Sequence, residues 1–292
     1  MERRVGNPQT CGPLRVQPHQ AGFGAAITGL SLREPLDPPT TAELRTLWLR
    51  HRVVYFPDQH LSLHELQRFA GSLGRLGHDP YVRPMAGHPH VLEVRREADE
   101  TVSPFGSSWH NDWSFQAHPP SATLLHAKVV PPVGGDTLFA DGVRAYESLD
   151  PALRADLDGL SALHSARRAY SHEGYLRGGG PGRSMPIRPG TQAWDVETHP
   201  VVRTHPETGE RALWINPVYT IGLQDVPRTE SDQLLAGLFA HALSPEFVYR
   251  HRWQPHMLTL WDNRCTMHAA QGGYDGYRRV MHRVTITGDR PR

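Results

Sequence analysis

Two short stretches of the 292-residue chain place a histidine two positions before a carboxylate: His110-Asn111-Asp112 and His205-Pro206-Glu207. Residues i and i+2 of a strand point to the same face, so either stretch could present an imidazole and a carboxylate to one metal ion. With one more histidine, such a pair forms the two-histidine, one-carboxylate set, which leaves metal positions open for other ligands. The chain has 19 histidines, so spacing and context must identify the ligands.

The surroundings of the two stretches differ. His205 lies among polar residues with a proline and a glycine nearby, which is typical of an exposed hairpin turn. His110 and Asp112 are bracketed by Trp109 and Trp113, which indicates a semi-buried wall. We therefore favour His110-Asn111-Asp112 as the metal site, although its spacing alone is also compatible with structural residues of that wall.

The C-terminal region adds two arginines. In a strand, Arg279 and Arg283 share one face with Met281 and Thr285, and the opposite face is mostly apolar. This pattern leaves two interpretations: the arginines point to solvent, or they point into a cavity where each guanidinium binds an anionic group. Four residues of strand separate them by about 13 Å, which is enough for two distinct anions.

Short strands and a few helices must position these side chains. Helices are predicted to begin at capping boxes formed by Thr40 with Glu43 and by Ser62 with Glu65, and a third follows Thr229. Many short strands separated by turns predict a mainly β sandwich or barrel with flanking α-helices packed outside. The predicted strands are Val53–Phe56, Val91–Val94, Ala122–Val130, Val201–Thr204, Ala212–Asn216, Leu258–Trp261 and Val280–Thr287.

No repeat or linker divides the sequence, so we expect residues 1–292 to form a single domain. The most flexible segment is the glycine-rich stretch Arg177–Arg183, and we interpret approximately residues 170–195 as a mobile lid. This stretch lacks the Gly-Lys-Ser/Thr ending of a phosphate-binding loop, which argues against nucleotide binding.

Composition narrows the class of protein. With 31 basic and 30 acidic residues, the net charge of +1 gives no electrostatic signal for nucleic acid or an anionic membrane. No stretch reaches the ~18 apolar residues of a membrane helix, and Met1–Pro8 precedes no signal-peptide core. Cys11 and Cys265 cannot form a disulfide framework, and we expect Cys265 to be a small buried residue. We expect a cytoplasmic protein with a small-molecule substrate, either monomeric or a homo-oligomer.

Four longer motifs stand out: Trp109-His110-Asn111-Asp112, Gly134-Gly135-Asp136-Thr137-Leu138, Arg203-Thr204-His205-Pro206-Glu207-Thr208-Gly209 and Trp261-Asp262-Asn263-Arg264. Together they resemble those of the taurine dioxygenase-like (TauD/TfdA) family of non-haem iron oxygenases, and the resemblance covers most of the chain. It implies a double-stranded β-helix (jelly roll) with iron at one mouth of the barrel. It also implies a dioxygenase that uses Fe(II), 2-oxoglutarate and O2 and releases succinate and CO2 while it oxidises, usually by hydroxylation, its substrate.

The resemblance assigns roles by position. His110, Asp112 and His268 correspond to the iron ligands, with His268 expected in a short loop after the strand that ends near Trp261. Arg279 corresponds to the partner of the distal carboxylate of 2-oxoglutarate. Thr137 corresponds to a hydroxyl donor to the same group.

The substrate side departs from the family pattern. Arg283 and Tyr219 match positions that face the anionic head of the substrate in sulfonate-oxidising members. The family's substrate-side histidine falls at Asp79, or at His78 if the alignment shifts by one residue, and Gly106 stands where a polar residue is expected. Because an aspartate would repel a sulfonate, a substrate with a cationic or donor group fits better than taurine. We expect a small organic acid, an amino-acid-like compound or a natural-product intermediate.

Two other functions use the same ligands. A metal-binding jelly roll could sense or bind a ligand without turnover, but it would not need the open iron site beside Arg279 and Thr137. A zinc hydrolase lacks a nearby candidate general base. Hydroxylation, desaturation and cyclisation remain alternative outcomes.

Overall fold

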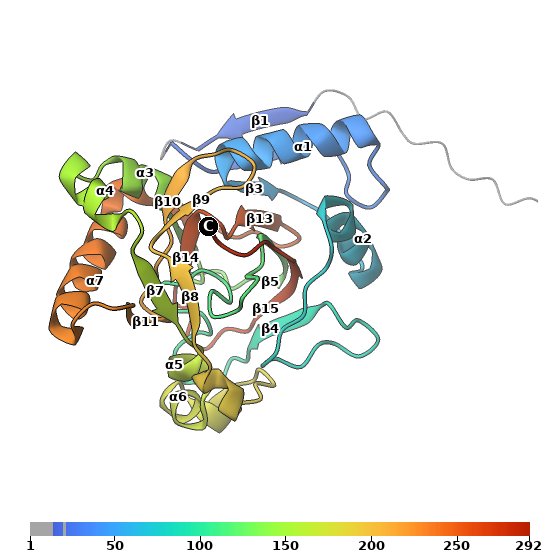
Figure 1. Cartoon of the computed structure of the whole chain (residues 1–292). Coiled ribbons are helices and arrows are strands. Elements are labelled where there is room, and N and C mark those ends of the chain that lie inside the picture. The colour runs from blue at the N-terminus through green and yellow to red at the C-terminus, as the bar shows by residue number, and fades with distance from the viewer. Residues whose placement is uncertain (1–13, 20–21) are drawn as a thin grey trace, which may run out of the picture.

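A ring of β-strands surrounds the centre of the molecule, and helices lie outside it (Figure 1). The computed structural model describes residues 14–19 and 22–292, so Cys11 and Met1–Pro8 lie outside the described residues. The largest sheet has the order β1-β2-β3-β13-β5-β15-β4, and smaller sheets have the orders β12-β6-β14, β11-β7-β8 and β10-β9. From β3 to β4 every neighbouring pair of the large sheet is antiparallel.

The elements follow one another as short strands interrupted by helices. The strands are β1 (Arg15–Pro18), β2 (Ala25–Thr28), β3 (Val53–Phe56), β4 (Leu92–Arg96), β5 (Ala122–Val129), β6 (Thr137–Asp141), β7 (Ser161–His164), β8 (Glu197–Pro200), β9 (Val202–Thr204), β10 (Arg211–Leu213), β11 (Thr220–Leu223), β12 (Val248–His251), β13 (Leu258–Asp262), β14 (Thr266–Ala270) and β15 (Arg279–Ile286). The helices are α1 (Pro38–His51), α2 (Leu63–Leu73), α3 (Gly142–Glu147), α4 (Pro151–Leu157), α5 (Arg167–Tyr170), α6 (His172–Arg177) and α7 (Arg228–Ala242), with 3-10 turns η1 (Gly180–Gly182), η2 (Thr191–Trp194) and η3 (Pro245–Phe247).

The predicted strands are confirmed, with shifts at their ends. β3 has the predicted bounds, and β15 begins one residue early, at Arg279. The prediction for Ala212–Asn216 ran too long. β10 ends at Leu213 because Asn216 belongs to a turn, in which its side-chain oxygen accepts from the backbone N–H of Tyr219.

One predicted helix start is wrong. The N-cap of α1 is Asp37, not Thr40, and the Asp37 carboxylate accepts from the backbone N–H of Thr40 at 2.7 Å. Two prolines occupy the first turn of α1, where a missing N–H costs nothing. The capping box of α2 is present as predicted, since the Ser62 hydroxyl accepts from the Glu65 N–H and the Glu65 carboxylate accepts from the Ser62 N–H.

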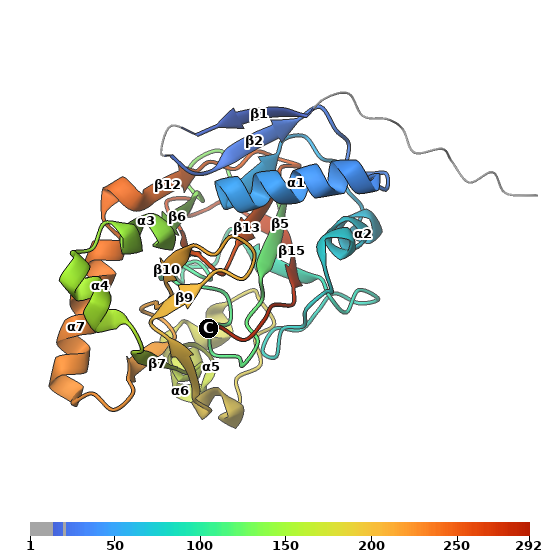
Figure 2. The ribbon, with the colours of Figure 1, turned by 45° about the horizontal axis from the view of Figure 1, so that its top comes forward.

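Helices α1 and α2 cover the outer face of the large sheet (Figure 2). Trp48 of α1 and Phe69 of α2 pack with Val54 of β3 and Leu124 of β5. The inner face packs against the sheet of β6 and β12 through a second cluster, which includes Leu125, Phe139, Tyr249, Trp261 and Met281. The barrel interior is therefore filled by side chains at one end and leaves room for a site only beside this cluster.

The position of β15 in the large sheet shows which way Arg279 and Arg283 point. It lies between β5 and β4, and Arg279 and Arg283 are each only 6 % exposed. Val284 and Ile286 point to the other face and join the core under α1 and α2. The interpretation that sends both arginines into the barrel is confirmed, and the solvent-facing alternative is wrong.

Candidate metal centre and its two pockets

Three buried side chains converge at one end of the barrel. Nε2 of His110 and Nε2 of His268 lie 3.6 and 3.8 Å from Oδ1 of Asp112, and ligand atoms of all three residues lie within 4.8 Å of one another. The main chains of the two histidines are paired by hydrogen bonds of 3.0 and 2.9 Å. His268 is therefore in β14, not in the loop expected from the sequence, because the turn that precedes this strand is short.

The protonation of this cluster suits a divalent cation. Nδ1 of His110 lies 2.7 Å from the carbonyl oxygen of Ser108, which can only accept, so Nδ1 carries the proton and Nε2 keeps its lone pair. Burial lowers the pKa of His110 and, further, that of His268, which keeps both imidazoles neutral. Burial would raise the pKa of Asp112, but the charge of Arg283 and several smaller contributions, including the hydrogen bond from Thr123, together outweigh it, and the pKa falls to about 2. Two neutral imidazoles and one carboxylate are the ligands of a non-haem iron site.

A chain of hydrogen bonds fixes the carboxylate of Asp112. The Thr123 hydroxyl donates to Oδ2 at 2.6 Å and accepts from Nδ2 of Asn263 at 2.9 Å. Oδ1 of Asn263 in turn accepts from the indole N–H of Trp261 at 2.9 Å. Sequence reasoning missed the roles of Thr123 and Asn263. The only signal was that Asn263 lies in the Trp-Asp-Asn-Arg motif.

A second buried arginine has no acidic partner. Nε and Nη2 of Arg279 make no hydrogen bond, and Arg279 forms no ion pair among the described residues. The indole of Trp253 lies near both predicted cosubstrate residues: its N–H donates to the Thr137 hydroxyl at 3.0 Å, and its ring is 5.9 Å from the guanidinium of Arg279. Because that hydroxyl accepts from Trp253, its own proton is free for another acceptor. Gly135, whose φ is +70°, leaves space beside this guanidinium, because a Cβ at this position would lie only 3.3 Å from Nε of Arg279.

The competing histidine–carboxylate stretch is structural. It forms the turn between β9 and β10, as expected, but His205 is 2 % exposed and not on the surface as predicted. Nδ1 of His205 accepts from the N–H groups of Glu207 and Thr208, so Nε2 carries the proton and donates to Asp262 at 3.0 Å. Cys265 is buried beside this pair, as predicted. Because both ring nitrogens of His205 are engaged in hydrogen bonds, His205 has no lone pair left to coordinate a metal ion.

A large cavity opens beside His110. Its volume is about 770 Å³, within the range of ligand-binding clefts. Tyr219 lines it with the ring edge toward His110 at 6.2 Å between centroids, and Gly106 lies next to them. The segment predicted as a lid contributes several lining residues: Tyr170, Gly174, Tyr175, Arg177, Gly178, Gly179, Arg183 and Ile187.

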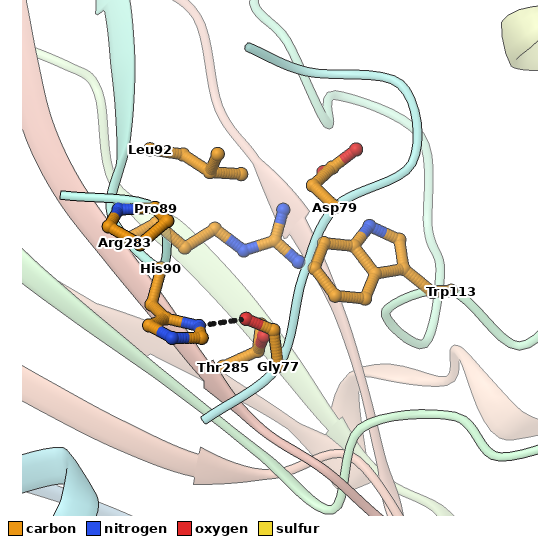
Figure 3. Close-up of a pocket in the computed structure, with 8 residues that line it drawn as sticks. All are labelled: Gly77, Asp79, Pro89, His90, Leu92, Trp113, Arg283 and Thr285. Atoms are coloured by element: carbon orange, nitrogen blue, oxygen red, sulfur yellow. Dashed lines mark hydrogen bonds between the residues drawn. The ribbon is translucent and has the colours of Figure 1, made fainter. Parts of the chain in front are cut away.

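Asp79 and Arg283 line a different space. They face each other in a chamber of about 10 Å³, where the guanidinium lies between Asp79 and Trp113 (Figure 3). This chamber shares no lining residue with the large cavity and has room for about one water molecule. Burial raises the pKa of Asp79, and the charge of Arg283 opposes that rise. The structure therefore brings Asp79 to Arg283 but not to the cavity beside His110.

His78 takes no part in either space. It is exposed, and its ring packs against that of His90 with 4.3 Å between centroids. Asp79 is held inward because its Oδ1 accepts from the backbone N–H groups of Tyr81 and Val82. Of the two alternatives left by the alignment, Asp79 is the one that faces the interior.

The chain is similar over nearly its whole length to known proteins. Residues 15–285 match the model of the family described as "Taurine catabolism dioxygenase TauD, TfdA family". It is 32 % identical to the (S)-phenoxypropionate/alpha-ketoglutarate-dioxygenase of Sphingobium herbicidovorans, over 94 % of this chain and 95 % of that protein. It is 33 % identical to the alpha-ketoglutarate-dependent sulfate ester dioxygenase of Pseudomonas putida, over 95 % and 91 %. The crystal structure of a taurine dioxygenase from Burkholderia xenovorans superposes with a TM-score of 0.78 at 33 % identity, covering 95 % and 92 %.

Proposed function

The chain belongs to the TauD/TfdA family, and from this premise we propose that His110, Asp112 and His268 hold the iron of this 2-oxoglutarate-dependent dioxygenase. The family fold is the jelly roll expected from the sequence. The enzyme uses Fe(II), 2-oxoglutarate and O2 to oxidise an organic substrate. When bound, the iron supplies the oxidising chemistry that converts 2-oxoglutarate to succinate and CO2.

The observation that carries this proposal is the convergence of two neutral imidazole nitrogens on one ionised carboxylate in a buried site. Thr123 occupies the second carboxylate oxygen, which leaves Oδ1 of Asp112 for a metal ion. Arg283, 2.7 Å from the same Oδ1, would then share that oxygen with the ion.

For the cosubstrate we propose Arg279 and Thr137. A buried guanidinium without a carboxylate partner is unstable unless an anion pairs with it, and its planar fork matches a carboxylate. The unpaired Nε and Nη2 of Arg279 support this role. The free proton of Thr137 supports a second hydrogen bond to the same carboxylate.

For the substrate we propose Tyr219 as the contact nearest the metal, because it lines the large cavity beside His110. We propose that Asp79 and Arg283, which face each other with opposite charges across the small chamber, bound the metal side of the site, with His78 outside it. The relatives act on a phenoxypropionate and on sulfate esters, so we propose an organic acid or ester, most simply hydroxylated, as the substrate of this enzyme.

An anaerobic experiment tests the proposal. Adding iron(II) and 2-oxoglutarate to the purified protein should produce the weak visible charge-transfer band of the chelate, and admitting O2 should then form succinate. Asp112→Ala should abolish both signals. A protein that gives neither band nor succinate with a broad panel of organic acids would sink the proposed function. Full activity in Asp112→Ala would place the metal elsewhere.

The proposal also covers the location, oligomeric state and domain organisation of the enzyme. In the part of the chain that the structure describes, no helix is long and apolar enough to span a bilayer. We propose a cytoplasmic enzyme that needs no nucleic-acid or membrane partner, which fractionation would test, and a homo-oligomer, which light scattering would test. We also propose that residues 1–292 form one domain in which residues 170–195 act as a lid, since eight of them line the cavity.

A further inference from the structure

The charged side chains that line the large cavity are basic. Among the residues that the structure describes, its lining includes Arg168, Arg177 and Arg183 and no aspartate or glutamate. Arg168 and Arg177 are exposed at the open side, whereas His110 is 7 % exposed at the buried end. The cavity therefore runs from a basic mouth to the proposed metal centre.

Two of these arginines are held in place without being neutralised. Nη1 of Arg168 donates to the carbonyl oxygens of Pro217 and Thr220 at 2.8 and 3.0 Å. Nη1 of Arg183 donates to the carbonyl oxygen of Ser103 at 2.8 Å. Within residues 14–19 and 22–292, neither guanidinium lies within 4.0 Å of a carboxylate oxygen, whereas Arg177 lies 3.9 Å from Glu173. Carbonyl partners fix the direction of a guanidinium and leave its charge and its other N–H groups for an anion.

The buried end offers no equivalent site for a substrate anion. Arg283 already faces two carboxylates: it lies 2.7 Å from Oδ1 of Asp112, and Asp79 lies beside it in the small chamber. Arg279 is the proposed partner of the cosubstrate. An anionic group of the substrate would therefore be stabilised more by the arginines at the mouth than by those near the proposed metal centre.

Part of the cavity wall is apolar or aromatic. This part is formed by Val102, Pro104, Phe105, Ile187, Val218 and Tyr219, and the hydroxyl-bearing residues Thr101, Ser103, Ser107 and Ser108 also line the cavity. Such a wall favours a hydrocarbon or aromatic body, because burying apolar surface stabilises the complex in proportion to its area.

We propose that the substrate is an elongated organic anion, a carboxylate or sulfate, whose anionic group is bound by Arg168 and Arg183 at the cavity mouth. Its apolar body lies along the wall, and its uncharged end reaches the proposed metal centre, where it is oxidised. This inference rests on the proposed function. It differs from the sequence expectation in placing the charged group of the substrate away from Arg283 and Asp79.

Binding to the non-reactive holoenzyme tests the proposal. The protein loaded with Mn(II) and N-oxalylglycine is titrated calorimetrically with matched pairs: alkyl sulfates against the corresponding alcohols, and alkyl carboxylates against their methyl esters, over a series of chain lengths. We expect the anion of the best pair to bind at least about tenfold more tightly than its neutral partner. Added salt should reduce that preference, because Arg168 is exposed.

Variants locate the anion site. Arg168→Gln and Arg183→Gln should each remove most of the preference for the anion, and Arg183→Lys should retain part of it. Arg167→Gln is the matched control, because Arg167 is in the same helix as Arg168 but packs on Trp194 and does not line the cavity. This control should keep the full preference.

Three results would overturn the proposal: no anion in the series binds, anion and neutral partner bind equally, or both glutamine variants keep the preference of the unmodified protein. The proposed function is judged separately. Each variant should still form the visible chelate band with iron(II) and 2-oxoglutarate. If the unmodified protein does not form this band, the proposed dioxygenase site is refuted, whereas the binding of anions at the cavity mouth is judged by the titrations alone.

Discussion

The hydroxyl of Thr123 lies 2.6 Å from Oδ2 of Asp112, and both side chains are buried. Because Asn263 donates to the same hydroxyl, the Thr123 proton has one direction left, which is toward the carboxylate. This relationship leaves Asp112 a single oxygen for the proposed metal ion and sets the orientation of that oxygen.

The first prediction concerns that hydrogen bond. Thr123→Val keeps the shape of the side chain and removes the donor, so the affinity for Mn(II) should fall by about tenfold or more, as is usual for partners of metal ligands. Calorimetry on the metal-free protein measures the change. Thr259→Val is the control, since Thr259 is a buried β-strand threonine whose hydroxyl bonds to His251. Equal metal affinity in the two variants would contradict the positioning role.

The second prediction concerns the cosubstrate. Arg279→Gln should raise the 2-oxoglutarate concentration needed for half-maximal succinate formation by about tenfold or more, since a charged hydrogen bond contributes about 1.5–3 kcal/mol. The control is Arg250→Gln, which removes an exposed arginine paired with Asp136. If the requirement of Arg279→Gln equals that of the control, the carboxylate is bound elsewhere.

The third prediction concerns stability in acid. Burial lowers the pKa of His126 from 6.5 to about 4, so below about pH 6.5 the unfolded chain binds a proton that the folded chain does not. The free energy of unfolding should therefore decrease as the pH falls from 6.5 to about 4, by up to ~1.4 kcal/mol per pH unit for this residue. His126→Gln should show a shallower slope in urea unfolding measured across this window. An unchanged slope would mean that His126 is not neutral in the folded protein.

The fourth prediction concerns the structural cluster around Asp262. Two guanidinium nitrogens of Arg264 and Nε2 of His205 bind this buried carboxylate. Asp262→Ala leaves a buried arginine without its main partner, so the free energy of unfolding should fall by about 3–5 kcal/mol. Asp158→Ala removes an exposed ion pair with Arg211 and should cost at most about 1 kcal/mol. Similar losses in both variants would argue against this account of Asp262.

The sequence predicted the parts of the fold and site that depend on local periodicity. The alternation of β15 correctly grouped Arg279 with Arg283, but local pattern alone could not choose the face, because both faces carry apolar residues. The choice depends on what covers each face in the folded barrel, where Val284 joins the core under α1 and α2 and Met281 joins the inner cluster. The turn at His205 was predicted from its proline and glycine, whereas its burial depends on Asp262, which is 57 residues away.

Other features of the site left no trace in residue spacing. Thr123 lies 11 residues from Asp112 and 140 from Asn263, so only the folded barrel brings the three together. The separation of Asp79 from the cavity beside His110 is likewise a property of packing. The alignment placed Asp79 near the substrate, and the small volume around it could not be inferred from the sequence.

The pairing of β15 with a neighbour on each side also limits how this enzyme can diverge. Inserting or deleting one residue between Arg279 and Arg283 would rotate one guanidinium out of the barrel and push an apolar side chain into it. Substrate preference is under no such restriction, because the mouth arginines Arg168 and Arg183 lie in α5 and in the segment that follows α6, which follow no strand register. During evolution, the length and charge of the cavity mouth can therefore change while the register of β15, which positions the proposed 2-oxoglutarate site, stays the same.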